Sequence, residues 1–262
     1  MDLQNKVVLI TGASSGLGKQ LCYDAAKAGA VVIACARRTK LIETVKENCR
    51  IISGQRAFAY QLDISDPEQV DQVLQQIQQE VGTIDILVNN AGFGLFENYL
   101  DTPFEEIRQM FEVNVLGLMY LTQRVAVTMI EQQSGHILNV ASIAGKLATP
   151  KSAVYSATKF AVLGFSNALR LELKPFNIQV TTVNPGPMDT AFFEKADPKG
   201  GYLASVQAFV TSPEVLSKKM IRVMNRPKRE INQPFIMDIA AKAYILFPRV
   251  GDFLAGGIFN KK

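Results

Sequence analysis

The sequence predicts an α/β fold in which one doubly wound parallel sheet of about seven strands carries helices on both faces. Two observations predict it. Short apolar runs, of which Lys6–Ile10 (KVVLI) is the first, alternate with longer stretches whose apolar residues recur at helical spacing. These runs are continuously apolar, as is typical of strands buried on both faces of a parallel sheet. The 262 residues fit one domain over residues 1–262, without internal repeats or low-complexity segments.

A glycine-rich turn joins the first strand to the first helix. The strand runs into Thr11–Gly18 (TGASSGLG), and a helical pattern covers residues 17–28. This is the setting in which backbone N–H groups at a helix N-terminus bind phosphate. Gly12 permits the tight turn, Gly16 lets the backbone approach a pyrophosphate, and Gly18 lets the helix pack close to the strand. The alternative is a plain tight turn between strand and helix.

Two arginines follow the second strand, Val31–Ala36. In sheets that bind NAD, an Asp or Glu near this position bonds the ribose 2′-hydroxyl. A guanidinium pairs instead with a 2′-phosphate through charge-assisted hydrogen bonds. We therefore predict NADP(H) over NAD(H), with Arg37 as the phosphate ligand and Arg38 stacked on the adenine. The alternative is that both arginines are solvated loop residues.

The remaining elements follow the same alternation. Strands are predicted at Ala57–Leu62, Ile84–Val88, Ile137–Val140, Ile178–Val183 and Glu230–Asn232, and helices at Lys40–Cys49, Pro67–Val81, Phe104–Ile130, Tyr155–Lys174 and Phe235–Phe247. Polar residues follow several strands at the carboxyl end, where sheets of this kind bind ligands. Asp63 is placed to hydrogen-bond an adenine amino group, and Asn89–Gly92 forms a small turn. Asn114 lies on the apolar face of its helix, so we expect its amide to bond backbone or an ordered water.

Tyr155 and Lys159 lie one turn apart on one face of a predicted helix. A phenol, with a pKa near ~10, is a poor acid or base at neutral pH. A fixed ammonium beside it stabilises the phenolate and lowers that pKa, so that the phenol can exchange a proton near pH 7. Ser142, in the loop after the preceding strand, can hold a substrate oxygen. The alternative for the pair is a half-buried ring beside a solvated amine.

With these motifs in order, the chain resembles a classical short-chain dehydrogenase/reductase over about residues 5–190, a family with a Rossmann-type fold. The resemblance rests on the glycine loop, Asp63, the Asn89–Gly92 turn, the tetrad Asn114, Ser142, Tyr155 and Lys159, and the segment Pro185–Thr190 (PGPMDT). The candidate cofactor contacts are Gly12, Ser14, Ser15, Gly16, Leu17, Gly18, Arg37, Arg38, Asp63, Ile64, Asn90, Ala91, Gly92, Tyr155, Lys159, Pro185, Gly186, Met188 and Thr190.

The resemblance implies hydride transfer between a nicotinamide and a carbonyl or secondary alcohol. In that mechanism Tyr155 exchanges the proton, and Lys159 tunes Tyr155 and holds the ribose. Ser142 orients the substrate oxygen, and Asn114 anchors a water that resupplies protons. Two other classes stay open: a sugar-nucleotide epimerase or dehydratase, and a non-catalytic regulator that senses dinucleotides. The length of the chain and the G-x-x-x-G-x-G spacing disfavour the first, whose members are typically longer and carry a G-x-x-G-x-x-G loop, and the intact tetrad disfavours the second.

The last third of the chain carries fewer signals. Residues 188–225 are expected to form a substrate lid around Gly200 and Gly201, in which Ala191, Phe192, Phe193 and Tyr202 join Phe93, Leu95, Phe96 and Leu147 in lining an apolar pocket. Residues 226–262 are expected to form an interface. It is predicted to belong to a homo-oligomer, a dimer or a tetramer. The less favoured alternative is peripheral contact with a membrane, helped by Lys228, Arg229, Lys242, Arg249, Lys261 and Lys262.

Composition excludes several other classes. The net charge of +4, without a long basic run, argues against nucleic-acid binding. His136 is the single histidine, which excludes metal sites built on several histidines, and no metal is predicted. Three cysteines without a CxxC pair predict reduced structural thiols. We expect a cytoplasmic protein, since no signal peptide and no apolar run of membrane-spanning length are evident.

Overall fold

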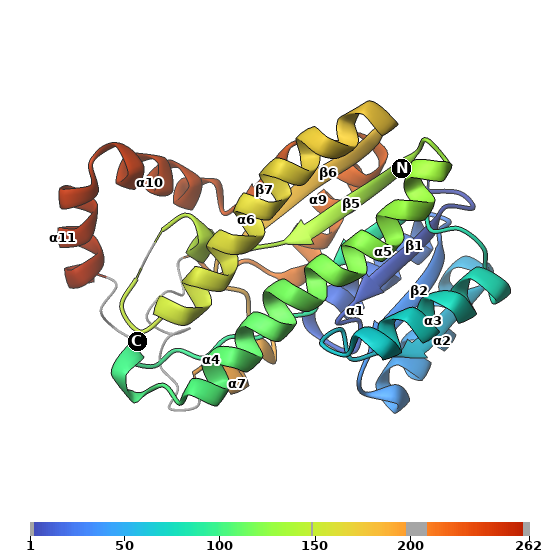
Figure 1. Cartoon of the computed structure of the whole chain (residues 1–262), viewed down its shortest axis with the longest axis horizontal. Helices are drawn as coiled ribbons and strands as arrows, with labels where there is room; N and C mark the ends of the chain where they lie inside the picture. The colour runs from blue at the N-terminus through green and yellow to red at the C-terminus, as the bar shows by residue number, and fades with distance from the viewer. Residues whose placement is uncertain (1–2, 148, 198–208, 259–262) are drawn as a thin grey trace.

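The computed structural model describes residues 3–147, 149–197 and 209–258. Its centre is a seven-stranded parallel sheet in the order β3-β2-β1-β4-β5-β6-β7 (Figure 1). The strands are β1 (Val7–Thr11), β2 (Val31–Ala36), β3 (Ala57–Gln61), β4 (Ile86–Asn89), β5 (Gly135–Val140), β6 (Ile178–Pro185) and β7 (Glu230–Gln233). The strand order reverses between β1 and β4, so the chain leaves these neighbours in opposite directions and opens a crevice at their carboxyl ends. The predicted doubly wound fold is confirmed.

Helices cover both faces of the sheet (Figure 1). The longer ones are α1 (Gly16–Lys27), α2 (Thr39–Ser53), α3 (Pro67–Glu80), α4 (Phe104–Phe111), α5 (Leu118–Glu131), α6 (Ala153–Leu173), α9 (Pro213–Asn225), α10 (Phe235–Leu246) and α11 (Pro248–Ile258). Helices α1, α2 and α9 share one apolar core with one face of the sheet, while α3, α5 and α6 share a second core with the other. Strand side chains alternate between them: Val8 and Ile10 belong to the first core and Leu9 to the second.

The helix predicted over 104–130 is interrupted by a π-helical turn. Residues Glu112–Gly117 form this turn between α4 and α5, and Asn114 lies within it, buried. By length and composition the stretch Phe104–Glu131 is apolar enough to cross a membrane, but half of its most apolar window is buried inside the protein. Its buried residues, among them Met110, Leu121, Val125 and Met129, pack in the protein core, while Phe104, Leu116 and Val127 are exposed. The π-turn was not predicted, and such turns often mark functional sites.

The predicted structural residues are buried as expected. The thiols of Cys22, Cys35 and Cys49 are free, and burial raises the pKa of Cys35 and of Cys49 to about 12. His136 lies in β5 with its Nε2 2.9 Å from the Thr181 hydroxyl, and burial lowers its pKa to about 4. These groups are therefore uncharged at neutral pH and belong to the core.

The segment predicted as a lid contains two different structures. Short helix α7 (Phe192–Ala196) lies beside the crevice, where a lid was expected. Helix α9 was not foreseen: it packs against α1, and the hydroxyl of Ser217 donates to the buried carboxylate of Asp24 at 2.7 Å. Gly200, Gly201 and Tyr202 lie outside the described residues.

The C-terminal segment contains β7 and two helices, α10 and α11, which lie to one side of the sheet (Figure 1). The seventh strand and the helix at 235–247 are confirmed. Large apolar side chains are exposed on these helices: Phe235, Ile236, Ile239, Ile245, Leu246, Phe247, Val250 and Phe253. That a subunit or a membrane covers this surface stays a prediction, and Lys261 and Lys262 lie outside the described residues.

Candidate active site

The glycine loop after β1 is shaped by two close constraints. Gly12 has a φ of +65°, a left-handed conformation that favours glycine. At Gly18 a Cβ would lie 2.4 Å from the carbonyl oxygen of Gly12 and 2.5 Å from Nδ2 of Asn90. No side chain fits there, so the first turn of α1 can lie directly against the loop. The cradle that a pyrophosphate needs is thus built into the backbone.

Asn90 ties this loop to the end of β4. Its Nδ2 donates to the carbonyl oxygen of Thr11 at 2.9 Å, and the backbone N–H groups of Asn90 and Ala91 both donate to the Thr11 hydroxyl at 3.0 Å. The same hydroxyl donates to the carbonyl oxygen of Val88 at 3.3 Å. The two strand ends that bound the crevice are therefore held together by one side chain from each.

The two arginines after β2 lie differently. Arg38 reaches over the glycine loop, where its guanidinium donates to the hydroxyls of Ser14 and Ser15, each at 2.8 Å. Arg37 is exposed and forms an ion pair with Asp63, with 3.7 Å between Nη1 and Oδ2. Both guanidinium groups line the same end of the crevice. Arg38 is the one in direct contact with loop hydroxyls, a feature that the sequence did not reveal.

Tyr155 and Lys159 lie on α6 at the other end of the crevice, and both are buried. The Lys159 ammonium donates to the carbonyl oxygen of Val140 at 3.0 Å and lies 5.7 Å from the centroid of the Tyr155 ring. Burial lowers the pKa of Lys159 to about 8. The predicted cation is therefore beside the phenol and is not a solvated amine.

Ser142 and Asn114 hold the surrounding loops. The Ser142 hydroxyl accepts from the backbone N–H of Ala144 at 3.0 Å and donates to the carbonyl oxygen of Pro185 at 3.3 Å. Asn114 accepts from the N–H of Phe93 at 3.0 Å and donates to its carbonyl oxygen at 2.7 Å. Its Nδ2 also lies 3.2 Å from the Thr158 hydroxyl. The expected pairing of Asn114 with backbone is confirmed.

These residues surround one cleft with a volume of about 460 Å³, within the usual range for small-molecule sites. Its lining includes Ser142 and every predicted cofactor contact except Gly18, namely Gly12, Ser14, Ser15, Gly16, Leu17, Arg37, Arg38, Asp63, Ile64, Asn90, Ala91, Gly92, Tyr155, Lys159, Pro185, Gly186, Met188 and Thr190. Asn114 and Gly18 lie behind this lining. The residues predicted from separate motifs are therefore neighbours in space.

The end of the cleft near Tyr155 is apolar. The Tyr155 ring meets Phe96 edge-on at 5.8 Å between centroids and lies 5.7 Å from Phe192. Phe93, Phe193 and Leu147 line the same region, as predicted, whereas Leu95 packs in the adjoining cluster without lining the cleft. The Tyr155 phenol therefore lies beside a predominantly apolar part of the cleft.

Comparison with known proteins identifies the scaffold. The sequence model of the short chain dehydrogenase family matches residues 6–200, a range that holds the glycine loop, Ser142 and the Tyr155–Lys159 pair. The chain belongs to the short-chain dehydrogenase family. It is thus a member of a family of oxidoreductases, and this reading is favoured over the epimerase and over the non-catalytic regulator.

Individual relatives are similar over most of the chain. A 3-dehydrosphinganine reductase from Danio rerio is 35% identical over 229 residues, which cover 85% of this chain and 69% of the relative. Two solved structures are each 32% identical to this chain. A serine dehydrogenase complexed with NADP+ has a TM-score of 0.79 over 87% of this chain and 94% of that one. A 3-ketoacyl-(acyl-carrier-protein) reductase from Brucella melitensis complexed with NADH has a TM-score of 0.77 over 85% of this chain and 92% of that one.

The sequence did not predict several residues that line the cleft of this short-chain dehydrogenase, among them Val113, Thr149 and Met237. Val113 comes from the π-turn, Thr149 from the loop before α6, and Met237 from α10. Met237 lies close to the cofactor segment, since a Cβ on Gly186 would be 2.8 Å from its sulfur. No local signal marks it, because an apolar residue on an apolar helix carries no chemistry of its own. Helix α10 is therefore part of the wall of the site.

Proposed function

We propose that this chain is an NADP(H)-dependent oxidoreductase that interconverts a carbonyl and a secondary alcohol on an apolar substrate. The observation that carries the proposal is the joint placement of Tyr155 and buried Lys159 in the apolar end of a cleft whose other end holds the glycine loop and Arg38. This arrangement offers a proton donor at one end and an anion site at the other.

The catalytic roles follow from the contacts. The glycine loop and Arg38 would hold NADPH, which when bound would supply the hydride for the carbonyl carbon. Tyr155 gives its phenolic proton to the carbonyl oxygen, and the Lys159 ammonium stabilises the phenolate that remains. Ser142 turns its hydroxyl proton from the Pro185 carbonyl oxygen towards the substrate oxygen and stabilises the charge that develops there. Asn114 keeps Phe93 and α6 in place and, as the family resemblance implies, anchors the water that resupplies the proton.

The substrate class is inferred from the cleft and supported by one relative. Phe93, Phe96, Phe192, Phe193 and Met237 surround the reacting end. Lys159 is the charged side chain at this end among the described lining residues, and its ammonium is engaged beside Tyr155. The name of the 3-dehydrosphinganine reductase relative denotes a ketone reductase, which agrees with this chemistry. We therefore propose a ketone on a hydrocarbon chain, handled in the direction of reduction.

The screen that tests the reaction follows NADPH absorbance with carbonyls of graded chain length. We expect kcat/KM to rise at least about tenfold from a short polar ketone to a long-chain ketone, because each buried methylene contributes about 0.8 kcal/mol. Alcohols of the same series, assayed with NADP+, report the reverse reaction. Absence of turnover across the series, with NADPH bound, would support the non-catalytic regulator instead.

Cofactor preference is a separate prediction. We expect KM for NADPH to be at least about tenfold below KM for NADH, because a charge-assisted bidentate contact with a 2′-phosphate is worth about 1.5–3 kcal/mol. Because Arg38 contacts the loop hydroxyls and Arg37 pairs with Asp63, we now propose Arg38 in place of Arg37 as the phosphate ligand. Arg38→Ala should then remove most of this difference by raising KM for NADPH alone. Lys40→Ala is the matched control: it removes a nearby exposed cation that does not line the cleft. Equal or better use of NADH by the unaltered protein would contradict the prediction.

A further inference from the structure

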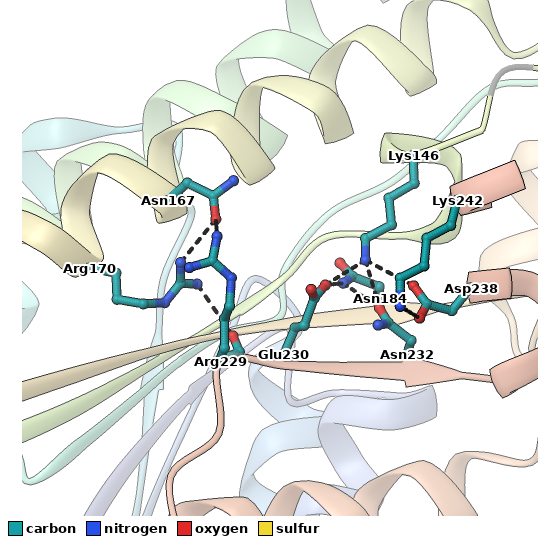
Figure 2. A network of polar contacts seen from close by, with 9 residues as sticks. All are labelled: Lys146, Asn167, Arg170, Asn184, Arg229, Glu230, Asn232, Asp238 and Lys242. Carbon is teal, nitrogen blue, oxygen red and sulfur yellow. Dashed lines mark hydrogen bonds and ion pairs between the residues drawn. The ribbon is translucent and has the colours of Figure 1, made fainter. Parts of the chain in front are cut away.

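Lys146 stands four residues after Ser142, at the end of the short helical turn Ile143–Gly145. Its backbone N–H donates to the carbonyl oxygen of Ile143 at 2.8 Å, so the backbone of Lys146 belongs to the same turn. Lys146 does not line the cleft, and its ammonium lies among polar groups of β7 and α10 (Figure 2). The proposed mechanism does not use this group.

The ammonium of Lys146 has three partners from two elements. It donates to the Glu230 carboxylate and to Oδ1 of Asn232 at 3.0 Å, both on β7, and to Oδ1 of Asp238 at 3.2 Å on α10. The Lys146 side chain is 16% exposed and that of Asp238 only 2%. An isolated charge at either position would be costly, so the buried Asp238 carboxylate depends on the cations beside it, Lys146 and Lys242.

Asn184, at the end of β6, completes the network (Figure 2). Its Nδ2 donates to the Glu230 carboxylate at 3.0 Å and to Oδ1 of Asn232 at 2.7 Å, the same two acceptors that Lys146 uses. The next residue, Pro185, supplies the carbonyl oxygen that accepts from Ser142. The network therefore connects to Ser142 in two ways. Lys146 belongs to the turn that follows Ser142, and Asn184 precedes Pro185, whose carbonyl oxygen accepts from Ser142.

Apolar contacts join the same two parts of the chain. Ile143 and Leu147, on either side of Lys146, pack in one cluster with Ala241, Met237 and Tyr244 of α10. Met237 and Leu147 both line the cleft. A displacement of α10 would therefore alter the shape of the apolar end of the site.

We propose that Lys146 is a positioning residue, whose ammonium joins the Ser142 loop to β7 and α10 and thereby sets the wall of the substrate pocket. This inference rests on the proposed function, because it concerns the pocket for the carbonyl substrate. In this proposal α10 forms one wall of the pocket, and the ionic contact between Lys146 of the Ser142 loop and Asp238 of α10 sets the position of that wall.

The variant Lys146→Met removes the ammonium and keeps an apolar side chain of similar length. We expect KM for the carbonyl substrate to rise about tenfold and kcat to fall about tenfold, while KM for NADPH stays within about twofold. Lys242→Met is the matched control: Lys242 also contacts Asp238, at 2.8 Å, but its side chain is 67% exposed and does not touch the Ser142 loop. We expect this control to keep all three constants within about twofold.

Hydrogen–deuterium exchange gives a readout that does not depend on turnover. In Lys146→Met, amide exchange should accelerate both in residues 142–147 and in α10, whereas Lys242→Met should leave 142–147 unchanged. Asp238→Asn, which keeps the side-chain shape, should reproduce the acceleration in both segments if Lys146→Met does not fold. Unchanged exchange in residues 142–147 would overturn the inference, as would an unchanged KM for the carbonyl. If the unaltered protein reduces no carbonyl, the proposed function fails, and exchange still decides whether Lys146 joins the two segments.

Discussion

Replacing Tyr155 with Phe is expected to lower kcat by about 10³-fold while the Kd for NADPH changes by less than about twofold. Positioned proton transfer contributes about 10²–10⁴-fold to a rate, and the variant loses the transferable proton. The ring itself keeps its contacts with Phe96 and Phe192, so the cleft retains its shape. Stopped-flow absorbance measures kcat, and a fluorescence titration measures NADPH binding.

The control for this variant is Tyr120→Phe. Tyr120 lies on α5, outside the cleft, and its hydroxyl donates to Asp71 at 2.9 Å. It loses a phenolic oxygen as Tyr155→Phe does, but no proton donor of the site, so its turnover should match that of the unaltered protein. Turnover in Tyr155→Phe close to that of the unaltered protein would remove the assigned role and with it the proposed mechanism.

Lys159→Met is expected to lower kcat by about 10²–10³-fold and yet to raise the free energy of unfolding by about 2 kcal/mol. Burial lowers the pKa of Lys159 from 10.5 to about 8, a difference that corresponds to about 3 kcal/mol of destabilisation at pH 7. Loss of the hydrogen bond to the Val140 carbonyl oxygen takes back about 1 kcal/mol. Urea unfolding of the protein without cofactor, together with steady-state rates, measures both changes.

The pH dependence of stability checks the same cause. Between about pH 8 and 10.5 the folded protein has released the Lys159 proton and the unfolded chain still holds it. The unfolded state therefore binds more protons, and the Lys159 contribution to the free energy of unfolding rises with pH in this window. Buried thiols titrate in both proteins alike, so the stability gained by Lys159→Met should shrink as pH rises from 8 to 10.5. A constant gain, or a less stable variant, would contradict the prediction. Lys40→Met, which changes an exposed lysine, should change neither stability nor rate.

Signals that are local in the chain predicted most of the framework. Apolar runs such as Val31–Ala36 mark strands because a strand inside a parallel sheet must bury both of its faces. Pro67 stands at the first position of a predicted helix, and the carboxylate of Asp66 before it caps that helix by accepting from the N–H of Gln69 at 3.1 Å. Strand ends were predicted less accurately than strands themselves, since β6 extends to Pro185 and not to Val183.

Features that depend on distant partners were not predicted. Helix α9 was not predicted, because the partner that buries its apolar face, α1, is distant in the sequence. The π-turn at Asn114 was not predicted, because its apolar residues have the same spacing as those of the α-helices around it. Its contacts with Phe93 and Thr158 appear only in the folded structure. Arg38 and Arg37 are adjacent and chemically alike, and only the positions of Ser14, Ser15 and Asp63 distinguish their contacts.

The sequence by itself determined the fold class, the glycine loop, the buried strands and the candidate proton donor with its lysine. Each of these depends on the spacing of residues close together in the sequence, because the regular geometry of helices and strands fixes which neighbouring side chains share a face. The tertiary structure alone decided that Met237 enters the cleft, that Lys146 joins the Ser142 loop to α10, and that Lys159 is buried enough for its pKa to fall to about 8. Burial and long-range contact are properties of the packed chain, because they depend on which surfaces exclude water together.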